Sequence, residues 1–202
     1  MAIVAAGSSL GQHFALRSMF KARKKVFVDL LEWNVPVVDG LYEIDQYDDE
    51  RATYVIVSDE CGRHKASARL LQTLGPHILG DLFPELCNHE VPRGLEVREI
   101  TRFCIDPGLG TDERREARKL LISALVDEAL AAGIRKFTAV AELAWMRQVL
   151  AFGWSCQPLG LPREIGGTKL GALGIDIDER TPGLLAREGI YLPQPEPARR
   201  AA

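Results

Sequence analysis

The chain has 202 residues, of which 47% are hydrophobic and 26% are charged, and its formal net charge is −3. This length and composition are ordinary for one globular domain with a well-filled core. The small net charge gives no general attraction to nucleic acid or membranes, and no apolar stretch approaches the roughly 18 residues that span a bilayer.

Residues 14–33 predict a helix, because apolar residues recur at helical spacing on one stripe: Leu16, Phe20, Phe27, Leu30 and Leu31. Arg23 falls on this stripe, between Phe20 and Phe27. A charged group there is costly unless it is paired. Alternatively, Arg23 extends its guanidinium to solvent at the edge of the stripe.

An acidic segment follows at residues 42–50, YEIDQYDDE, with no Lys or Arg interleaved. Its five acids are Glu43, Asp45, Asp48, Asp49 and Glu50. Such a segment is either a solvated loop or a source of counter-charges for arginines elsewhere in the fold.

Residues 52–59 and 64–71 predict a β-hairpin, since two β-rich runs flank the turn ECGR. Alternation along the second strand places Lys65, Ser67 and Arg69 on one face, and Ala66, Ala68 and Leu70 on the other. A long stretch rich in turn formers comes next, and we predict it to be irregular.

Strands alternate with helices in the second half. We predict strands over residues 95–106 and 135–142, and helices over 113–132 and 143–152, each ended by a glycine. WSCQPLG and TKLGALGIDID supply late strands, and Thr181-Pro182 starts a short helix. This order favours an α/β sandwich with a mixed sheet.

Glu99 and Arg102 lie three residues apart on the strand VREITRFCI, so in a regular strand they face opposite sides of the sheet. Three readings stay open. Glu99 and Arg102 are two surface charges, or they serve different sites, or a β-bulge between them turns both toward one cleft.

Four blocks, RKKVFVDLLEW, YEIDQYDDERATYVIV, ASARLLQT and REITRF, together resemble the signature blocks of the acyl-homoserine-lactone synthases. These are the LuxI-type autoinducer synthases of quorum-sensing bacteria. The blocks occur in family order, and the resemblance covers about residues 15–180. The family fold resembles the GNAT (acyl-CoA N-acyltransferase) enzymes, which implies a three-layer α-β-α sandwich with a mixed, mainly antiparallel sheet.

The family's motif positions fall on eight residues of matching type: Arg23, Phe27, Trp33, Asp45, Asp48, Arg69, Glu99 and Arg102. Two local departures occur. Arg98 precedes the motif glutamate, where the family usually has an aromatic residue, and Thr101 replaces the frequent serine before the motif arginine.

The resemblance implies an acyltransferase that joins an acyl thioester, carried on acyl carrier protein or coenzyme A, to the amine of S-adenosylmethionine. The substrate's carboxylate then closes the lactone and expels 5′-methylthioadenosine. We assign catalysis to Glu99, Arg102 and Arg23, with Glu99 as the base. The residues expected to bind S-adenosylmethionine are Arg23, Phe27, Trp33, Asp45, Asp48, Arg102 and Phe103, and Arg69, Asp45 and Asp48 would form an electrostatic cluster.

The acyl chain needs an apolar pocket, for which we nominate Thr138, Val140, Met146 and Leu150. In the family, a threonine on this strand accompanies acceptance of 3-oxo acyl chains. An acidic carrier protein would dock on basic clusters: Lys21, Lys24 and Lys25, or Arg114, Arg115, Arg118 and Lys119. For most of these apolar and basic residues, core packing and a solvated helix face are the alternatives.

Two other functions compete. One is a GNAT-type, coenzyme A-dependent N-acyltransferase of another amine, although Asp112 and Glu113 stand where an incoming pyrophosphate needs bare N–H groups. The other is a family member that only binds its ligand.

The remaining expectations concern partners, location and the chain ends. Four scattered cysteines, Cys61, Cys87, Cys104 and Cys156, predict free thiols in a reducing cytoplasm and no metal site. The N-terminus lacks the features of a signal peptide. We expect no cofactor, no nucleic-acid or membrane partner, a single domain over residues 1–192 and a disordered tail over 193–202.

Overall fold

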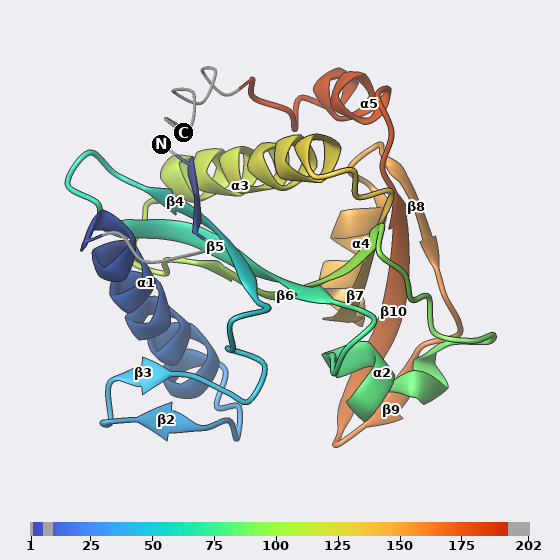
Figure 1. The fold of residues 1–202 in the computed structure, drawn as a ribbon, viewed down its shortest axis with the longest axis horizontal. Coiled ribbons are helices and arrows are strands. Elements are labelled where there is room, and N and C mark those ends of the chain that lie inside the picture. Colours follow the sequence, from blue (N-terminus) through green and yellow to red (C-terminus); the bar gives the residue numbers. More distant parts are fainter. Residues whose placement is uncertain (1, 6–9, 194–202) are drawn as a thin grey trace.

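The computed structural model describes residues 2–5 and 10–193. Its centre is an eight-stranded sheet in the order β1-β4-β5-β6-β7-β10-β8, with β9 also paired to β10 (Figure 1). The strands are β1 (Ala2–Ala5), β4 (Thr53–Ser58), β5 (His64–Gln72), β6 (Val97–Ile105), β7 (Lys136–Glu142), β8 (Ser155–Pro158), β9 (Arg163–Ile165) and β10 (Thr168–Asp176). Among the strands of the described residues, β6 and β7 alone are parallel, so the sheet is mixed and mainly antiparallel, as predicted.

Helices cover both faces of the sheet. They are α1 (Leu10–Arg23), a π-helix (Lys24–Leu30), α2 (Ile78–Leu82), a 3₁₀-helix (Pro84–Leu86), α3 (Thr111–Ala131), α4 (Leu143–Leu150) and α5 (Thr181–Arg187). Figure 1 shows α3 above the sheet and α1 and α2 below it. This arrangement confirms the three-layer sandwich.

The alternation of side chains along β4 separates the two cores. Val55 and Val57 pack in the core formed with α3 and α4, whereas Tyr54 and Ile56 pack against α1. The same period of two along β5 directs Ala66, Ala68 and Leu70 toward the α3 core. The predicted faces of the hairpin are therefore confirmed.

The single helix predicted over residues 14–33 is wrong in its second half. After Arg23 the chain continues as a π-helix, whose wider turn takes later residues off the α-helical stripe. Leu30 and Leu31 are consequently 61% and 47% exposed, although the stripe predicted them to be buried. Arg23 keeps its inward position and is 1% exposed, so it does not reach solvent.

Several short elements were not predicted. The stretch expected to be irregular contains α2 and the 3₁₀-helix, and β1, β9 and the hairpin β2 (Val37–Val38) and β3 (Tyr42–Glu43) were missed. Such elements are too short for a periodic signal and depend on tertiary contacts. Leu79 and Leu86, for example, are fully buried against Ala172 of β10.

A β-bulge lies in β6. Thr101 pairs with Arg69, but the next pair joins Cys104 to Ser67, so β6 carries one extra residue there. Arg102 takes up this residue with a φ of 51°, in the left-handed region that non-glycine residues rarely adopt. The bulge that would turn Glu99 and Arg102 toward one cleft is present.

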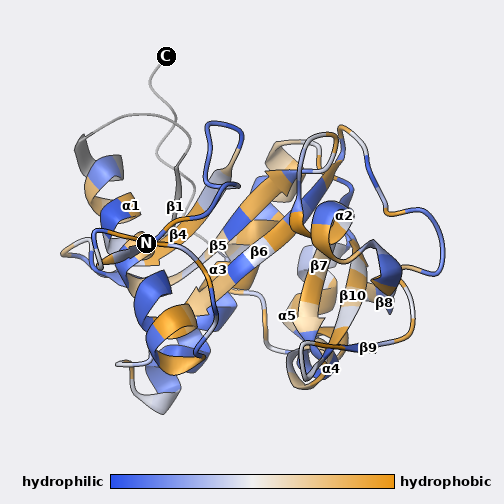
Figure 2. Ribbon diagram, turned by 90° about the horizontal axis from the view of Figure 1, so that it is seen from below, coloured by the Kyte–Doolittle hydropathy of each residue, from blue (hydrophilic) through white to orange (hydrophobic). Residues whose placement is uncertain are grey.

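The parallel strands β6 and β7 pair over four residues only, Val97–Ile100 against Lys136–Ala139. Both strands continue beyond these pairs without bonding to each other, so the sheet is open between the bulge and the end of β7. Figure 2 shows hydrophilic segments on β5 and β6 in the middle of a largely hydrophobic sheet. The functional residues gather at this opening.

The described residues contain no helix with the length and hydropathy to cross a bilayer. All four cysteines are free. The predicted division into residues 1–192 and a tail stays a prediction, and residues 194–202 lie outside the described part of the chain.

Candidate active site

Three arginines from three separate elements meet three carboxylates from the acidic segment. Arg23, at the end of α1, donates from both terminal nitrogens to Asp48, at 2.8 Å each, and from Nε to Glu43. Arg69 of β5 donates to both oxygens of Asp45, at 2.6 and 3.1 Å, and its Nη1 lies 2.8 Å from Asp48.

Arg102 of β6 completes this acid–arginine cluster. Its Nη2 donates to Glu43 at 2.9 Å and to Asp45 at 2.7 Å. Each of the six side chains is at most 9% exposed. The three positive and three negative groups balance, which is what permits this many charges in the interior.

The charges inside the cluster hold their ionised forms. Burial by itself would raise the pKa of Asp48, but the hydrogen bonds from Arg23 and the charge of Arg69 outweigh it and hold this pKa well below its ordinary value. Burial likewise opposes the charge on Arg23, yet Asp48 and Glu43 raise its pKa above the ordinary one.

Glu43 is a functional residue that the sequence analysis did not single out. It is fully buried and bridges Arg23 and Arg102, which gives it as central a place as Asp45 or Asp48. A local signal was available, because residues 43 and 45 of an extended segment face the same side.

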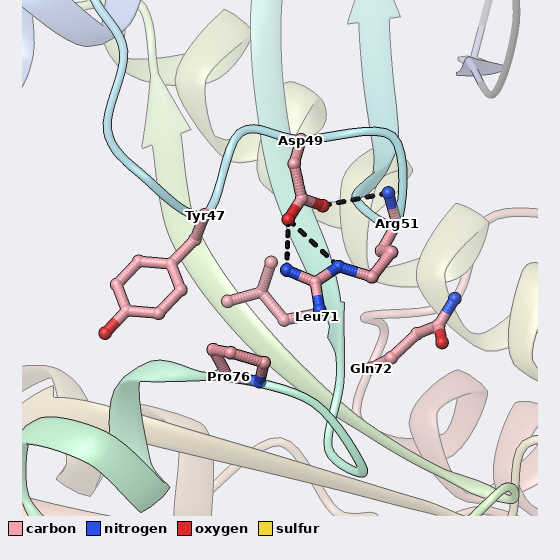
Figure 3. Close-up of a pocket in the computed structure, with 6 residues that line it drawn as sticks. All are labelled: Tyr47, Asp49, Arg51, Leu71, Gln72 and Pro76. Atoms are coloured by element: carbon pink, nitrogen blue, oxygen red, sulfur yellow. Dashed lines mark hydrogen bonds and ion pairs between the residues drawn. The ribbon is translucent and has the colours of Figure 1, made fainter.

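Asp49 belongs to a different environment. Figure 3 shows its carboxylate turned toward Arg51, whose backbone N–H and Nε donate to it at 2.9 Å each. The shallow pocket drawn there has about 10 Å³, space for about one water molecule, and is no substrate site. The side chains of Asp49 and Arg51 are 33% and 47% exposed, so this pair faces solvent.

Two aromatic rings lie beside the cluster. Phe27 and Trp33 stack with their centroids 4.8 Å apart, and the guanidinium of Arg102 lies 5.6 and 5.8 Å from them. Phe27 is buried, whereas Trp33 is 38% exposed. The rings therefore offer a π-surface that extends from the buried cluster toward solvent.

Glu99 is fully buried and stands apart from the cluster. Its Oε1 accepts a hydrogen bond of 2.8 Å from the backbone N–H of Leu79 in α2, and its Oε2 has no partner. Burial raises the pKa of Glu99 to about 7, although the backbone N–H groups of Leu79 and Ile78 and the charge of Arg69 oppose this shift.

A cavity of about 800 Å³ passes through the opening between β6 and β7. One end is polar and aromatic, lined by Phe27, Trp33, Asp45, Glu99, Arg102 and Phe103. The other end is apolar, lined among others by Leu125 of α3, Val149 of α4, Phe152, Trp154 and Ile175 of β10. Its walls suit a molecule with a charged head and an apolar chain.

The predicted site residues divide into two groups. Phe27, Trp33, Asp45, Glu99, Arg102, Phe103 and Val140 line the cavity. Arg23, Asp48 and Arg69 lie outside its wall, and Arg69 and Asp48 bond Asp45, which is part of it. Of the nominated acyl-chain residues, Thr138, Met146 and Leu150 are not in the wall, and the apolar end comes from elements that the sequence analysis did not connect.

The fold defines the structural class of the protein. The fold is similar to that of a solved structure described as an N-acetyltransferase from Lactobacillus plantarum. That structure has a TM-score of 0.59 at 16% identity, covering 88% of this chain and 98% of that one, so it shows the fold alone. The architecture is GNAT-like.

The sequence comparisons then give the family. A family model described as autoinducer synthase matches residues 8–183. An acyl-homoserine-lactone synthase of Ralstonia solanacearum is 34% identical over 164 residues, which are 79% of this chain and 80% of that protein. The chain belongs to the autoinducer synthase family, and it is an acyltransferase of the acyl-homoserine-lactone synthase type.

Solved structures agree with this assignment. TofI, in a ternary complex with an inhibitor and MTA, is 31% identical with a TM-score of 0.78, over 92% of this chain and 96% of that one. BjaI, a CoA-dependent acyl-homoserine lactone synthase with SAM and isopentyl-CoA, is 26% identical with a TM-score of 0.80, over 96% and 92%.

Proposed function

We propose that this enzyme acylates the amine of S-adenosylmethionine with an acyl thioester, closes the lactone and releases 5′-methylthioadenosine, producing a quorum-sensing signal. The observation that carries the proposal is a buried carboxylate with a free oxygen, Glu99, in the same cavity as a guanidinium and two stacked aromatic rings. The ligands in the TofI and BjaI structures support it.

Glu99 is the proposed base. An α-amino group has a reference pKa of about 7.7–8.0, so it is largely protonated at neutral pH and must lose a proton before it attacks. A base is most effective when its own pKa lies near the working pH. The pKa of Glu99, about 7, meets this requirement.

Arg102 is the proposed partner of the substrate carboxylate. Of the two arginines assigned to catalysis from the sequence, Arg102 and Arg23, only Arg102 lines the cavity. Arg23 keeps the geometry through Glu43, which holds both arginines. The sulfonium would lie against Phe27 and Trp33, whose π-faces attract a cation.

Two further groups serve the acyl thioester. The bulge at Arg102 takes backbone N–H groups of β6 out of the regular ladder, and we propose that they donate to the developing oxyanion. The acyl chain would then enter the apolar end of the cavity, with Val140 among its walls. A role for Met146 and Leu150 would be to pack behind this wall.

An acidic acyl carrier protein is the proposed donor. Lys25 bonds Asp106 at 3.3 Å, which brings the cluster of Lys21, Lys24 and Lys25 next to the loop that leads into α3. The second basic cluster begins on α3 with Arg114, which lines the cavity. The start of α3 is less suited to coenzyme A. The backbone N–H of Gly110 donates to the carboxylate of Glu113 at 3.1 Å, so one donor fewer is free for a pyrophosphate.

Salt dependence distinguishes the donors. We expect the KM for an acyl carrier protein to rise at least about threefold between 50 and 300 mM NaCl. Added salt shortens the distance over which exposed charges attract each other, which is about 10 Å at 0.1 M. Steady-state kinetics with acyl-coenzyme A at the same salt concentrations is the control. A carrier-protein KM that stays constant would argue against this docking surface.

One assay tests the activity itself. The protein is incubated with S-adenosylmethionine and a mixture of acyl donors, and the products are identified by mass. We expect equal amounts of methylthioadenosine and an acyl lactone. An acyl amide without methylthioadenosine would indicate an ordinary N-acyltransferase. We also propose that the reaction uses no cofactor beyond its two substrates. The cytoplasmic location of the protein stays a prediction.

A further inference from the structure

Glu99 and Thr138 are neighbours across the short parallel pairing. Their Cα atoms are register partners in β6 and β7, so their side chains lie side by side on the same face of the sheet. The N–H of Leu79 in α2 reaches Glu99 on this face. Both side chains are 0% exposed.

Each of these two residues leaves one buried oxygen without a hydrogen bond. They are Oε2 of Glu99 and Oγ1 of Thr138. A buried polar atom without a partner is costly and rare, and such atoms often mark a place where a proton or a water molecule is handled. Two of them on paired residues point to one shared function.

Among the described residues, no polar group bonds the hydroxyl from the far side. Thr138 pairs there with Gly174 of β10, which has no side chain. The side chain of Leu159 covers that position, because a Cβ on Gly174 would lie 3.0 Å from it. Thr138 is also absent from the cavity wall, whereas Glu99 is part of it. The polar side chain next to the hydroxyl across the strand pairing is therefore Glu99, which itself lines the cavity.

We propose that Thr138 is a positioning residue for Glu99. Its hydroxyl donates a hydrogen bond to one bound water that donates to Oε2, and this bridge fixes the carboxylate for the amine of the substrate. The ammonium proton passes to Oε2, and the freed lone pair of the nitrogen attacks the thioester carbonyl. The C–N bond forms as the C–S bond breaks, and the leaving thiolate takes up the second proton of the nitrogen. This inference rests on the proposed function, because it needs Glu99 as the base.

The surroundings of Glu99 explain why one donor matters. The backbone N–H groups of α2 and the charge of Arg69 on β5 favour its ionised form, while burial and the charge of Asp81 on α2 disfavour it. Thr138 adds a donor from β7, and a hydrogen bond to the charged form lowers a carboxyl pKa. Its loss should therefore raise the pKa of Glu99.

The test compares Thr138→Val, which keeps the shape, with Thr138→Ser, which keeps the hydroxyl. In the substrate-free protein, NMR titration of the Glu99 carboxyl carbon should show a pKa higher by up to about one unit in T138V, and the wild-type value in T138S. If T138V does not fold, Thr138→Ala replaces it as the variant without a hydroxyl. An unchanged titration in the hydroxyl-free variant would overturn the proposal.

Turnover gives the second readout. T138V should lower kcat about tenfold with both a 3-oxo and an unsubstituted acyl donor, shift the acid limb of the pH profile upward and leave the KM for S-adenosylmethionine unchanged. In a Glu99→Gln background it should add no further loss. A loss confined to the 3-oxo donor would overturn the proposal and make Thr138 an acyl-recognition residue. A wild-type protein without lactone synthesis would contradict the proposed function, while the titration still tests the pairing.

Discussion

Replacing Glu99 by glutamine should lower kcat by about 10²–10⁴-fold, the usual contribution of a positioned general base. The amide keeps the size of the carboxylate and still offers an oxygen to the N–H of Leu79, so the fold should persist. The measurement is lactone formation under saturating substrates, with a far-UV circular dichroism spectrum and a thermal melt as controls. A variant that folds and turns over at near wild-type rates would remove Glu99 as the base.

The pH dependence of the same variant provides an internal check. Wild-type kcat/KM should fall as the pH drops below about 7, where Glu99 becomes protonated. The free energy of unfolding should change in the opposite direction and rise as the pH drops. The pKa of Glu99 is about 7 in the folded protein and 4.5 as its ordinary value, so its contribution is complete below pH 4.5 and is lost as the pH rises through 7. This loss, about 3 kcal/mol, should be absent from Glu99→Gln in urea titrations at several pH values.

Replacing Arg23 by alanine should cost about 3–5 kcal/mol of unfolding free energy, because it leaves Glu43 and Asp48 buried without their main partner. Such a loss is a large part of the stability of a typical domain. Urea denaturation at pH 7 measures it. Activity should fall as well, since Glu43 also holds Arg102 at the cavity.

Arg51→Ala is the matched control. It also removes an arginine paired with an acid of the same segment, Asp49, but both partners are partly exposed. Exposed pairs contribute about 0.2–1 kcal/mol, so this variant should be close to wild type. Equal effects of the two substitutions would show that the buried cluster is not what orders the segment.

The acid–arginine cluster shows what the sequence could predict about the site. The sequence identified most of the cluster's residues, but it did not predict which of them pair with each other. Motif positions identified Arg23, Asp45, Asp48, Arg69 and Arg102, and the structure brings all of them together. Which acid pairs with which arginine could not be predicted from local patterns, because paired residues such as Glu43 and Arg102 are 59 positions apart in the sequence. Pairing over such distances depends on which elements pack together.

The sequence by itself determined the family, the hairpin with its two faces and the alternation of strands and helices. It did so because motif spacing and side-chain periodicity are local properties of the chain. Tertiary structure alone decided that the first helix widens after Arg23, that Arg102 adopts a positive φ in a bulge, and that the cavity passes between β6 and β7. It also placed Thr138 behind Glu99 and outside the cavity wall. Each of these results depends on contacts between segments distant in sequence, which no periodicity records.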